Sequence, residues 1–195
     1  ELKLYQRSPL LAPPGCKALH EMGAAPVIQD GDLTLAESGA CIEYISHKYA
    51  NGKLFLRPED PAYADFLYWW HWATGTFGPA MSRMMLIHSA GLGDDNQIVK
   101  YMKVKANGAL KFLDERLQNN EWLAGSEFTV ADIMVIFSLT TSRYFSHYSL
   151  GDYPNILSYL KRIVNREAYR KAMKTSDTPM ESALVANPPK SDCKL

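Results

Sequence analysis

Residues 32–49 read DLTLAESGACIEYISHKY, and this stretch decides how the first part of the chain folds. A short run typical of a strand leads directly into a helical pattern, with Glu37 and Ser38 at the junction. We expect Ser38 to be the N-cap of the helix, with Glu37 just outside it. The unpaired N–H groups of a helix start also bind carboxylates, and a glutamate binds ammonium groups, so a ligand site is the alternative. The buried face of the helix is predicted to carry Cys41, Ile42, Ile45 and Tyr49.

A β-hairpin is predicted just before this helix. Residues 26–36, PVIQDGDLTLA, contain two short β-rich runs, and the Asp-Gly pair at 30–31 is a strong turn signal. Pro26 fits an edge strand, because the missing N–H of a proline is tolerated at a strand start. The alternative is a cis peptide bond that turns the backbone of Val27 toward a peptide-like ligand. Residues 1–7, ELKLYQR, alternate well enough to predict a further short strand.

The chain is expected to change character near residue 55. Residues 1–55 contain the β-rich runs, and residues 56–61 read LRPEDP, a linker whose two prolines stop helix and strand alike. Residues 62–186 read as helical throughout, and residues 187–195 as a polar tail. The sequence therefore predicts an α/β domain followed by an all-α helical bundle.

The helical part carries three local signals. A kink is expected at Gly78-Pro79, because a proline removes one helical hydrogen bond and crowds the preceding turn. Thr129 and Asp132 have the spacing of a capping pair at a helix start. Pro154 suits the first turn of another helix.

Composition narrows the classes of partner. The 21 basic and 21 acidic side chains give a formal net charge of zero, which argues against nucleic acid or an anionic membrane as the main partner. No apolar run is long enough to suggest a membrane span. Cys16, Cys41 and Cys193 are scattered and odd in number, so neither a disulfide framework nor a metal site is indicated. We expect a reducing, cytoplasmic setting.

Aromatic residues and methionines are concentrated in residues 67–88. Helix core together with a subunit contact is the simpler interpretation. The alternative is a pocket for hydrophobic substrates, because methionine adapts to varied apolar shapes. That pocket is predicted to be lined by Trp72, Phe77, Met81 and Met85. No catalytic acid, base or nucleophile can be identified from residue spacing.

Two motifs resemble the glutathione transferase family. Residues 24–45, AAPVIQDGDLTLAESGACIEYI, are similar to its proline, hairpin and Glu-Ser helix start in the expected order. Residues 121–133, EWLAGSEFTVADI, are similar to the signature of its helical domain. The resemblance covers residues 1–185 and is nearest to a fungal or bacterial subgroup. It implies a thioredoxin-like first domain, of which only part is present, followed by an all-helical second domain, a homodimer and glutathione as co-substrate.

The resemblance also implies roles for single residues. Val27, after a cis Pro26, would pair with the cysteinyl backbone of glutathione. Glu37 and Ser38 would hold its γ-glutamyl end. Ala24 stands where many members have a lysine, which puts one contact to the glycyl carboxylate in doubt.

The first strand and first helix of the family are absent from the sequence. That segment carries the Tyr, Ser or Cys that activates the glutathione thiol, so the catalytic residue is unknown and is expected in residues that precede Glu1. Cys16 and Cys41 are poor substitutes, because Cys16 lies beside a proline loop and Cys41 is expected on a buried helix face, where thiols are inert.

The resulting functional hypothesis is a transferase that conjugates the glutathione thiolate to hydrophobic electrophiles, as in detoxification. A non-catalytic glutathione-binding or regulatory protein is the alternative. Glutathione-dependent peroxidase or thiol–disulfide chemistry is the third candidate.

Overall fold

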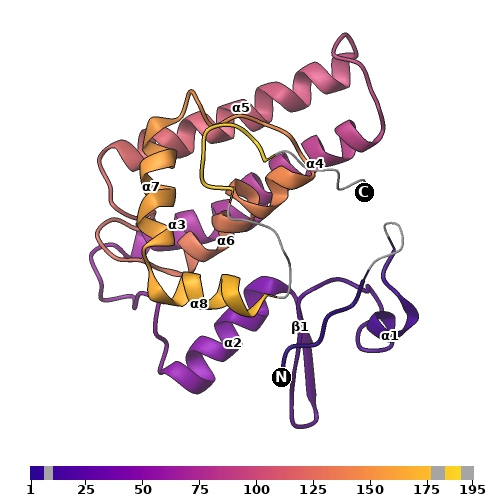
Figure 1. Cartoon of the computed structure of the whole chain (residues 1–195). Coiled ribbons are helices and arrows are strands. Elements are labelled where there is room, and N and C mark those ends of the chain that lie inside the picture. Colours follow the sequence, from indigo (N-terminus) through magenta and orange to yellow (C-terminus); the bar gives the residue numbers. More distant parts are fainter. Residues whose placement is uncertain (7–10, 177–182, 190–195) are drawn as a thin grey trace. The chain divides into compact units, whose positions relative to one another are not determined.

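The computed structural model describes residues 1–6, 11–176 and 183–189. The chain divides into two compact units, one over Glu1–Phe55 and a second that begins at Leu56 (Figure 1).

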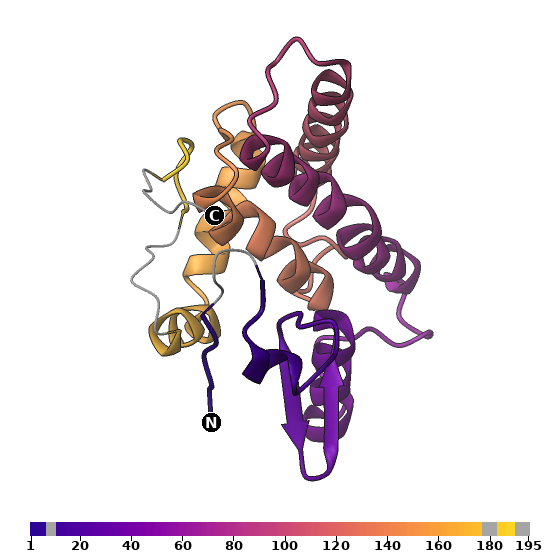
Figure 2. The same ribbon diagram turned by 90° about the vertical axis from the view of Figure 1, so that its right-hand side faces the viewer.

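The first unit is built around a β-hairpin and one long helix. Its elements are α1 (Pro14–Lys17), β1 (Val27–Asp30), β2 (Leu33–Ala36) and α2 (Ser38–Ala50). The strands pair antiparallel, from Val27 opposite Ala36 to Asp30 opposite Leu33, as the turn signal predicted. Gly31 lies in the turn with φ of 59°, a left-handed conformation that glycine adopts without strain. Helix α2 runs alongside the hairpin (Figure 2).

The strand predicted over residues 1–7 is wrong for the part that the structure describes. Residues 1–6 have no strand conformation, and Arg7 lies outside the described residues. Leu2 and Leu4 are 59% and 55% exposed. A strand is stabilised by hydrogen bonds to a neighbour, and in the described part of the chain β1 and β2 pair only with each other. Residues 1–6 therefore have no partner strand among the described residues.

Two details of α2 differ from the prediction. Its first residue is Ser38 and its N-cap is Glu37, so Ser38 is not the capping residue. The buried residues of the helix are Cys41 and Ser46, whereas Ile45 and Tyr49 are 46% and 63% exposed. The helix end explains the shift, because the Ser46 hydroxyl donates to the carbonyl of Lys53 at 2.6 Å and is covered by the returning chain.

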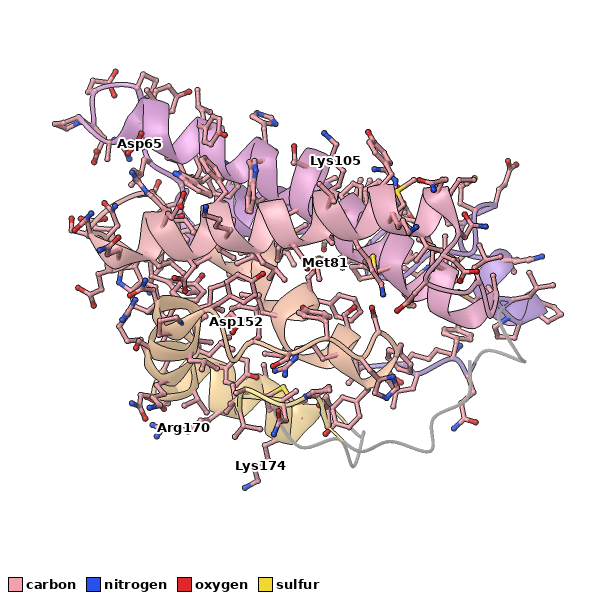
Figure 3. The ribbon with its side chains drawn as sticks, turned by 90° about the horizontal axis from the view of Figure 1, so that it is seen from above. Asp65, Met81, Lys105, Asp152, Arg170 and Lys174 are labelled. Carbon is pink, nitrogen blue, oxygen red and sulfur yellow. The ribbon has the colours of Figure 1, made fainter. Side chains whose placement is uncertain are left out.

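The second unit is helical. Its long helices are α3 (Tyr63–Trp72), α4 (Gly78–Ser89), α5 (Gln97–Gln118), α6 (Val130–Leu139), α7 (Pro154–Val164) and α8 (Glu167–Thr175), with short helical turns η1 (Ala73–Phe77) and η2 (Thr141–Tyr144). Helix α5 packs on α4 and α7, and α3 packs on α6. Met81 is buried among these helices, whereas Lys105 and Lys174 project outward from α5 and α8 (Figure 3).

The kink predicted at Gly78-Pro79 takes the form of a wider helical turn. Residues Ala73–Phe77 form a π-helical turn that joins α3 to α4. Proline has no N–H to donate, and the wider turn accommodates the missing hydrogen bond. The two helices are therefore joined by an irregular turn and not by a break. The Thr74 hydroxyl donates to the carbonyl of His71 at 3.2 Å within this turn.

A buried carboxylate organises the start of α6. The capping box predicted for Thr129 and Asp132 is confirmed. Asp132 is fully buried and accepts from the N–H of Thr129 at 2.8 Å, the N–H of Leu123 at 3.0 Å and the Tyr159 hydroxyl at 2.9 Å. Burial raises the pKa of Asp132, and these hydrogen bonds oppose the rise. The carboxylate ties three segments of the unit together.

A buried guanidinium holds the described C-terminal residues. Arg143 is fully buried and donates to the carbonyls of Ala183 and Val185 at 2.9 Å and of Ala186 at 2.8 Å. Its own pKa is lowered by burial. The carbonyls replace the water that the charge loses on folding, which is the requirement for a buried charge. Residues 183–186 are thereby fixed to η2.

Candidate functional site

The hairpin brings the four predicted ligand residues to one end of the first unit. The Ala25–Pro26 peptide bond is cis, as the resemblance implies, and Val27 is the first residue of β1. Val27 is paired with Ala36, the last residue of β2. Glu37 and Ser38 follow Ala36 directly, so they lie beside Pro26 and Val27 although ten residues separate them along the chain.

Glu37 has an unusual backbone conformation. Its φ of 72° lies in the left-handed region, which a glutamate seldom adopts and which costs about 1–3 kcal/mol. The Glu37 side chain is exposed and Ser38 is half-buried. The carbonyl of Glu37 accepts from the N–H of Cys41 at 2.8 Å, which begins the helix. Strain of this kind is concentrated at functional sites, where the surrounding structure maintains it.

The chemistry of this end suits a small peptide-like ligand. The first N–H groups of α2 have no acceptor within the helix, and together with the Ser38 hydroxyl they favour a carboxylate. The exposed Glu37 carboxylate favours an ammonium group. The backbone of Val27 offers strand-like hydrogen bonding. A cavity of about 860 Å³ lies beside β1; Pro26 and Val27 line it, whereas Glu37 and Ser38 do not.

One basic residue near this end was not found from the sequence. A Cβ atom placed on Gly23 would lie 3.2 Å from Cγ and 3.8 Å from Cε of Lys17, so the Lys17 side chain runs along the loop that precedes Ala24. The signal is spatial, because seven residues separate Lys17 from Ala24. Lys17 therefore places a cation near the position where the resemblance lacks a lysine.

The opposite end of the hairpin carries a polar cluster that was also not found from the sequence. Oδ2 of Asp30 accepts from the Tyr44 hydroxyl at 2.7 Å, from Nζ of Lys48 at 2.8 Å and from the Tyr49 hydroxyl. These donors hold the pKa of Asp30 well below its usual range, with the Lys48 hydrogen bond as the largest cause. The same pairing raises the pKa of Lys48.

The residues predicted to line a hydrophobic pocket are mostly core residues of the second unit. Phe77 and Met81 are 0% and 1% exposed, and Trp72 is 8% exposed. The Trp72 and Phe77 rings stack with centroids 5.1 Å apart. Met85 is half-buried. A substrate reaches Phe77 and Met81 only if neighbouring side chains move, so their proposed role as pocket lining stays a prediction.

The two cysteines of the described residues are both buried. The Cys41 thiol donates to the carbonyl of Leu35 at 3.4 Å, and burial raises its pKa. A thiol of this kind stays protonated and is a weak nucleophile. Neither cysteine is therefore assigned a reactive role.

Two kinds of feature are absent from the described part of the chain. Within it, no group of three or more His, Cys, Asp or Glu side chains is arranged to hold a metal ion. Over the same residues, no helix has both the length and the apolar character that crossing a membrane requires.

Comparisons with known proteins place the chain in a family. A family model described as "Glutathione S-transferase, C-terminal domain" matches residues 73–167. A solved glutathione S-transferase from Actinobacillus pleuropneumoniae is 30% identical with a TM-score of 0.77, and the match covers 91% of this chain and 81% of that one. The chain belongs to the glutathione S-transferase family. Its fold is a thioredoxin-like N-terminal domain followed by an all-helical C-terminal domain, which confirms the predicted fold class.

Curated relatives come from several kingdoms. Glutathione S-transferase 3 of Schizosaccharomyces pombe is 27% identical over 88% of this chain and 76% of its own length. The Disulfide-bond oxidoreductase YfcG of Escherichia coli is 28% identical over 72% of this chain and 64% of its own length. Glutathione is the co-substrate of the family, and a Burkholderia graminis transferase structure, 23% identical with a TM-score of 0.65 over 85% of this chain and 72% of that one, holds two glutathione molecules per subunit.

Proposed function

We propose that the protein binds glutathione at the Pro26, Val27, Glu37 and Ser38 end of the first unit and conjugates its thiolate to hydrophobic electrophiles. One observation carries the proposal: the hairpin register places the cis-proline segment beside a helix start whose N-cap, Glu37, is held at φ of 72°. No purely structural need of the hairpin explains a glutamate in that conformation, because glycine adopts it without strain.

The γ-glutamyl and cysteinyl residues of glutathione match the groups at this end of the first unit. The γ-glutamyl carboxylate lies against the N–H groups at the start of α2 and the Ser38 hydroxyl, and its ammonium group pairs with Glu37. The cysteinyl residue pairs with the Val27 backbone as a strand would. This arrangement leaves the cysteinyl thiol between the two anchored ends.

Lys17 completes the site at the glycyl end. Ala24 supplies no charge, whereas the Lys17 side chain runs past Gly23 and reaches the same loop. Lys17 is exposed and no ion pair of Lys17 is found among the described residues. Its ammonium group is therefore free to bind the glycyl carboxylate.

Catalysis by such a site consists of thiol activation and alignment. A hydrogen bond to the thiolate lowers the thiol pKa, and the bound geometry holds the sulfur against an apolar acceptor. The buried thiols of Cys16 and Cys41 supply neither group. The activating Tyr, Ser or Cys of the family is thus not assigned to a described residue.

The glutathione site is tested by Ser38→Ala. Removal of the hydroxyl is expected to weaken glutathione binding by about threefold to tenfold, the effect of losing one ordinary hydrogen bond, with an unchanged circular dichroism spectrum. Ser126→Ala is the matched control, because Ser126 is an exposed serine of the second unit. Isothermal titration calorimetry compares the three proteins. Equal affinity in Ser38→Ala and wild type contradicts the assignment.

We also propose that the protein is a homodimer. The outer faces of α3 and α5 expose large apolar side chains, with Tyr68, Tyr101, Val104 and Phe112 between 40% and 68% exposed. The Tyr68 and Phe112 rings lie 6.3 Å apart, and Gly75 and Gly108 leave open space beside them. An exposed apolar surface of this kind is typical of a subunit interface.

The dimer is tested by Val104→Asp. A charge at the centre of an apolar interface is expected to shift the protein to a monomer, which sedimentation velocity measures directly. Val185→Asp is the control, because Val185 has a similar exposed fraction of 66% against 68% for Val104. A wild-type monomer at micromolar concentration, or a Val104→Asp dimer, contradicts the proposal.

Disulfide reduction is the second candidate activity, because the YfcG relative is named as a disulfide-bond oxidoreductase. Parallel assays of one preparation with an aromatic electrophile and with a glutathione-dependent disulfide substrate separate the two reactions. Conjugation that is faster than disulfide reduction supports the transferase, and the reverse supports the oxidoreductase. Glutathione binding without either turnover indicates the non-catalytic alternative.

A further inference from the structure

The Asp30 cluster joins the two elements that carry the candidate glutathione site. Asp30 is the last residue of β1, and Val27 is the first. Its three donors, Tyr44, Lys48 and Tyr49, come from the second half of α2, whereas Ser38 begins that helix. The cluster therefore joins the C-terminal end of β1 to the C-terminal half of α2. The ligand residues lie at the N-terminal ends of these two elements.

The N-terminal ends of β1 and α2, which carry the ligand residues, are connected by fewer hydrogen bonds between side chains. The connection there is the short chain Ala36–Glu37–Ser38, and Glu37 within it has a strained backbone. The side-chain hydrogen bond between β2 and α2 near that point comes from the Cys41 thiol to the Leu35 carbonyl at 3.4 Å, and a thiol is a weak donor. If the contacts of Asp30 with α2 are lost, the helix can turn about this junction and relieve the backbone strain of Glu37.

The hydrogen bonds of the Asp30 cluster are of a kind that holds β1 firmly against α2. One carboxylate oxygen accepts three hydrogen bonds, one of them from an ammonium group, and hydrogen bonds to charged groups are stronger than those between neutral ones. Nζ of Lys48 lies 5.0 Å from the centre of the Tyr44 ring and 5.6 Å from that of Tyr49. These ring contacts restrict the lysine to one place. An isolated exposed ion pair contributes little, whereas this network has a fixed geometry.

We propose that Asp30 is a positioning residue of the glutathione site, which sets the angle between β1 and α2 and thereby the direction in which the first N–H groups of α2 point relative to the Val27 backbone. The proposal rests on the proposed function. Asp30 does not touch the ligand in this account, and its effect on binding passes through the placement of Ser38 and Glu37.

The test is a double-mutant cycle between Asp30→Ala and Ser38→Ala, with the dissociation constant of glutathione measured by calorimetry. Asp30→Ala alone is expected to weaken binding about threefold to tenfold, and its effect in the Ser38→Ala background is expected to be smaller than twofold, because coupled residues are not additive. Asp32→Asn is the control, since Asp32 is an exposed acid of the same hairpin turn.

Turnover gives a second readout that a purely stabilising residue does not move. Asp30→Ala is expected to raise KM for glutathione and to leave kcat at saturating glutathione unchanged, because the ligand restores the fastened arrangement when it binds. Lys48→Met and Tyr49→Phe each remove one donor and are expected to give smaller increases in KM.

The outcomes separate the two proposals. Wild-type affinity in Asp30→Ala, or equal fold-losses of Asp30→Ala in both backgrounds, overturns the positioning role and leaves the glutathione site intact. No binding of glutathione by the wild-type protein overturns the proposed function itself.

Discussion

Asp132 in the helical unit and Asp30 in the hairpin unit both collect hydrogen bonds from distant parts of the chain, but they differ in burial. Asp132 is 0% exposed and its donors have no access to water, whereas the Asp30 side chain is 29% exposed. A buried donor that loses its acceptor keeps the full desolvation penalty, while an exposed one turns to water. The helical unit therefore uses its carboxylate for stability, and the hairpin unit uses its carboxylate for geometry.

The contrast extends to the backbone. In the helical unit the start of α7 is satisfied from within, because Asp114 accepts from the N–H groups of Asn155 and Ile156 at 2.9 Å. In the hairpin unit α2 begins with no side-chain cap, as α3 and α8 also do, but its N-cap Glu37 is the one with a strained backbone. A helix start left open in this way is available to a ligand. The predictions below test this division, beginning with the largest expected effect.

Loss of the buried carboxylate is expected to have the largest effect. Asp132→Ala removes the acceptor of four buried donors and should lower the free energy of unfolding by about 3–5 kcal/mol. Asp132→Asn keeps one oxygen and should cost clearly less. Urea unfolding followed by circular dichroism measures both. A loss below about 1 kcal/mol in Asp132→Ala shows that the network does not stabilise the unit.

Release of the C-terminal residues is expected to rank second. Arg143→Met removes the guanidinium donor from the carbonyls of Ala183, Val185 and Ala186, of which Ala186 still accepts from the N–H of Leu150, and should destabilise by about 2–4 kcal/mol. Limited proteolysis should then cleave near residues 183–186 faster than in the wild type. Arg170→Met serves as the comparison, because Arg170 is exposed on α8 (Figure 3). An Arg143→Met protein as resistant as the Arg170→Met protein contradicts this role of the guanidinium.

Glu37→Gly is expected to act in opposite directions on stability and binding. Glycine adopts a φ of 72° without strain, so the free energy of unfolding should stay equal or rise by about 0.5–1 kcal/mol. Glutathione affinity should fall severalfold, because the ammonium group loses its carboxylate. Thermal unfolding and calorimetry on the same sample separate the two effects. A large loss of stability, or an unchanged affinity for glutathione, contradicts the proposal that the strained conformation of Glu37 serves ligand binding.

The pH dependence of the Asp30 cluster should be the smallest effect. The pKa of Asp30 is lowered in the folded protein, so its stabilising contribution is complete above the unfolded value near about 4 and is lost as the pH falls below it. The stability difference between wild type and Asp30→Asn should thus be constant from neutral pH to about pH 5 and shrink only in stronger acid. A difference that shrinks on going from pH 8 to pH 6 points to another titrating group.

Local features of the fold were predictable from the sequence because turn and cap chemistry acts over a few residues. The Asp-Gly pair at 30–31 predicted the hairpin, and the spacing of Thr129 and Asp132 predicted the start of α6. The prediction of Ser38 as the N-cap of α2 was wrong, because serine is a far commoner cap than a glutamate with positive φ. Only the tertiary structure maintains that conformation of Glu37.

Features that join distant residues were not predictable. The donors to Asp30 lie 14 to 19 residues away, and the carbonyls held by Arg143 lie 40 to 43 residues away, so no spacing rule indicates either. The concentration of aromatic residues and methionines in residues 67–88 singled out Phe77 and Met81, but such a composition does not distinguish residues that pack in a core from residues that line a pocket.

The most direct test of the central claim is a crystal structure of the protein with glutathione bound. The γ-glutamyl carboxylate is expected at the N-terminus of α2, within hydrogen-bonding distance of the Ser38 hydroxyl, and the cysteinyl backbone is expected to pair with Val27. Glutathione bound at saturating concentration elsewhere in the molecule, with Glu37 and Ser38 in contact only with water, contradicts it.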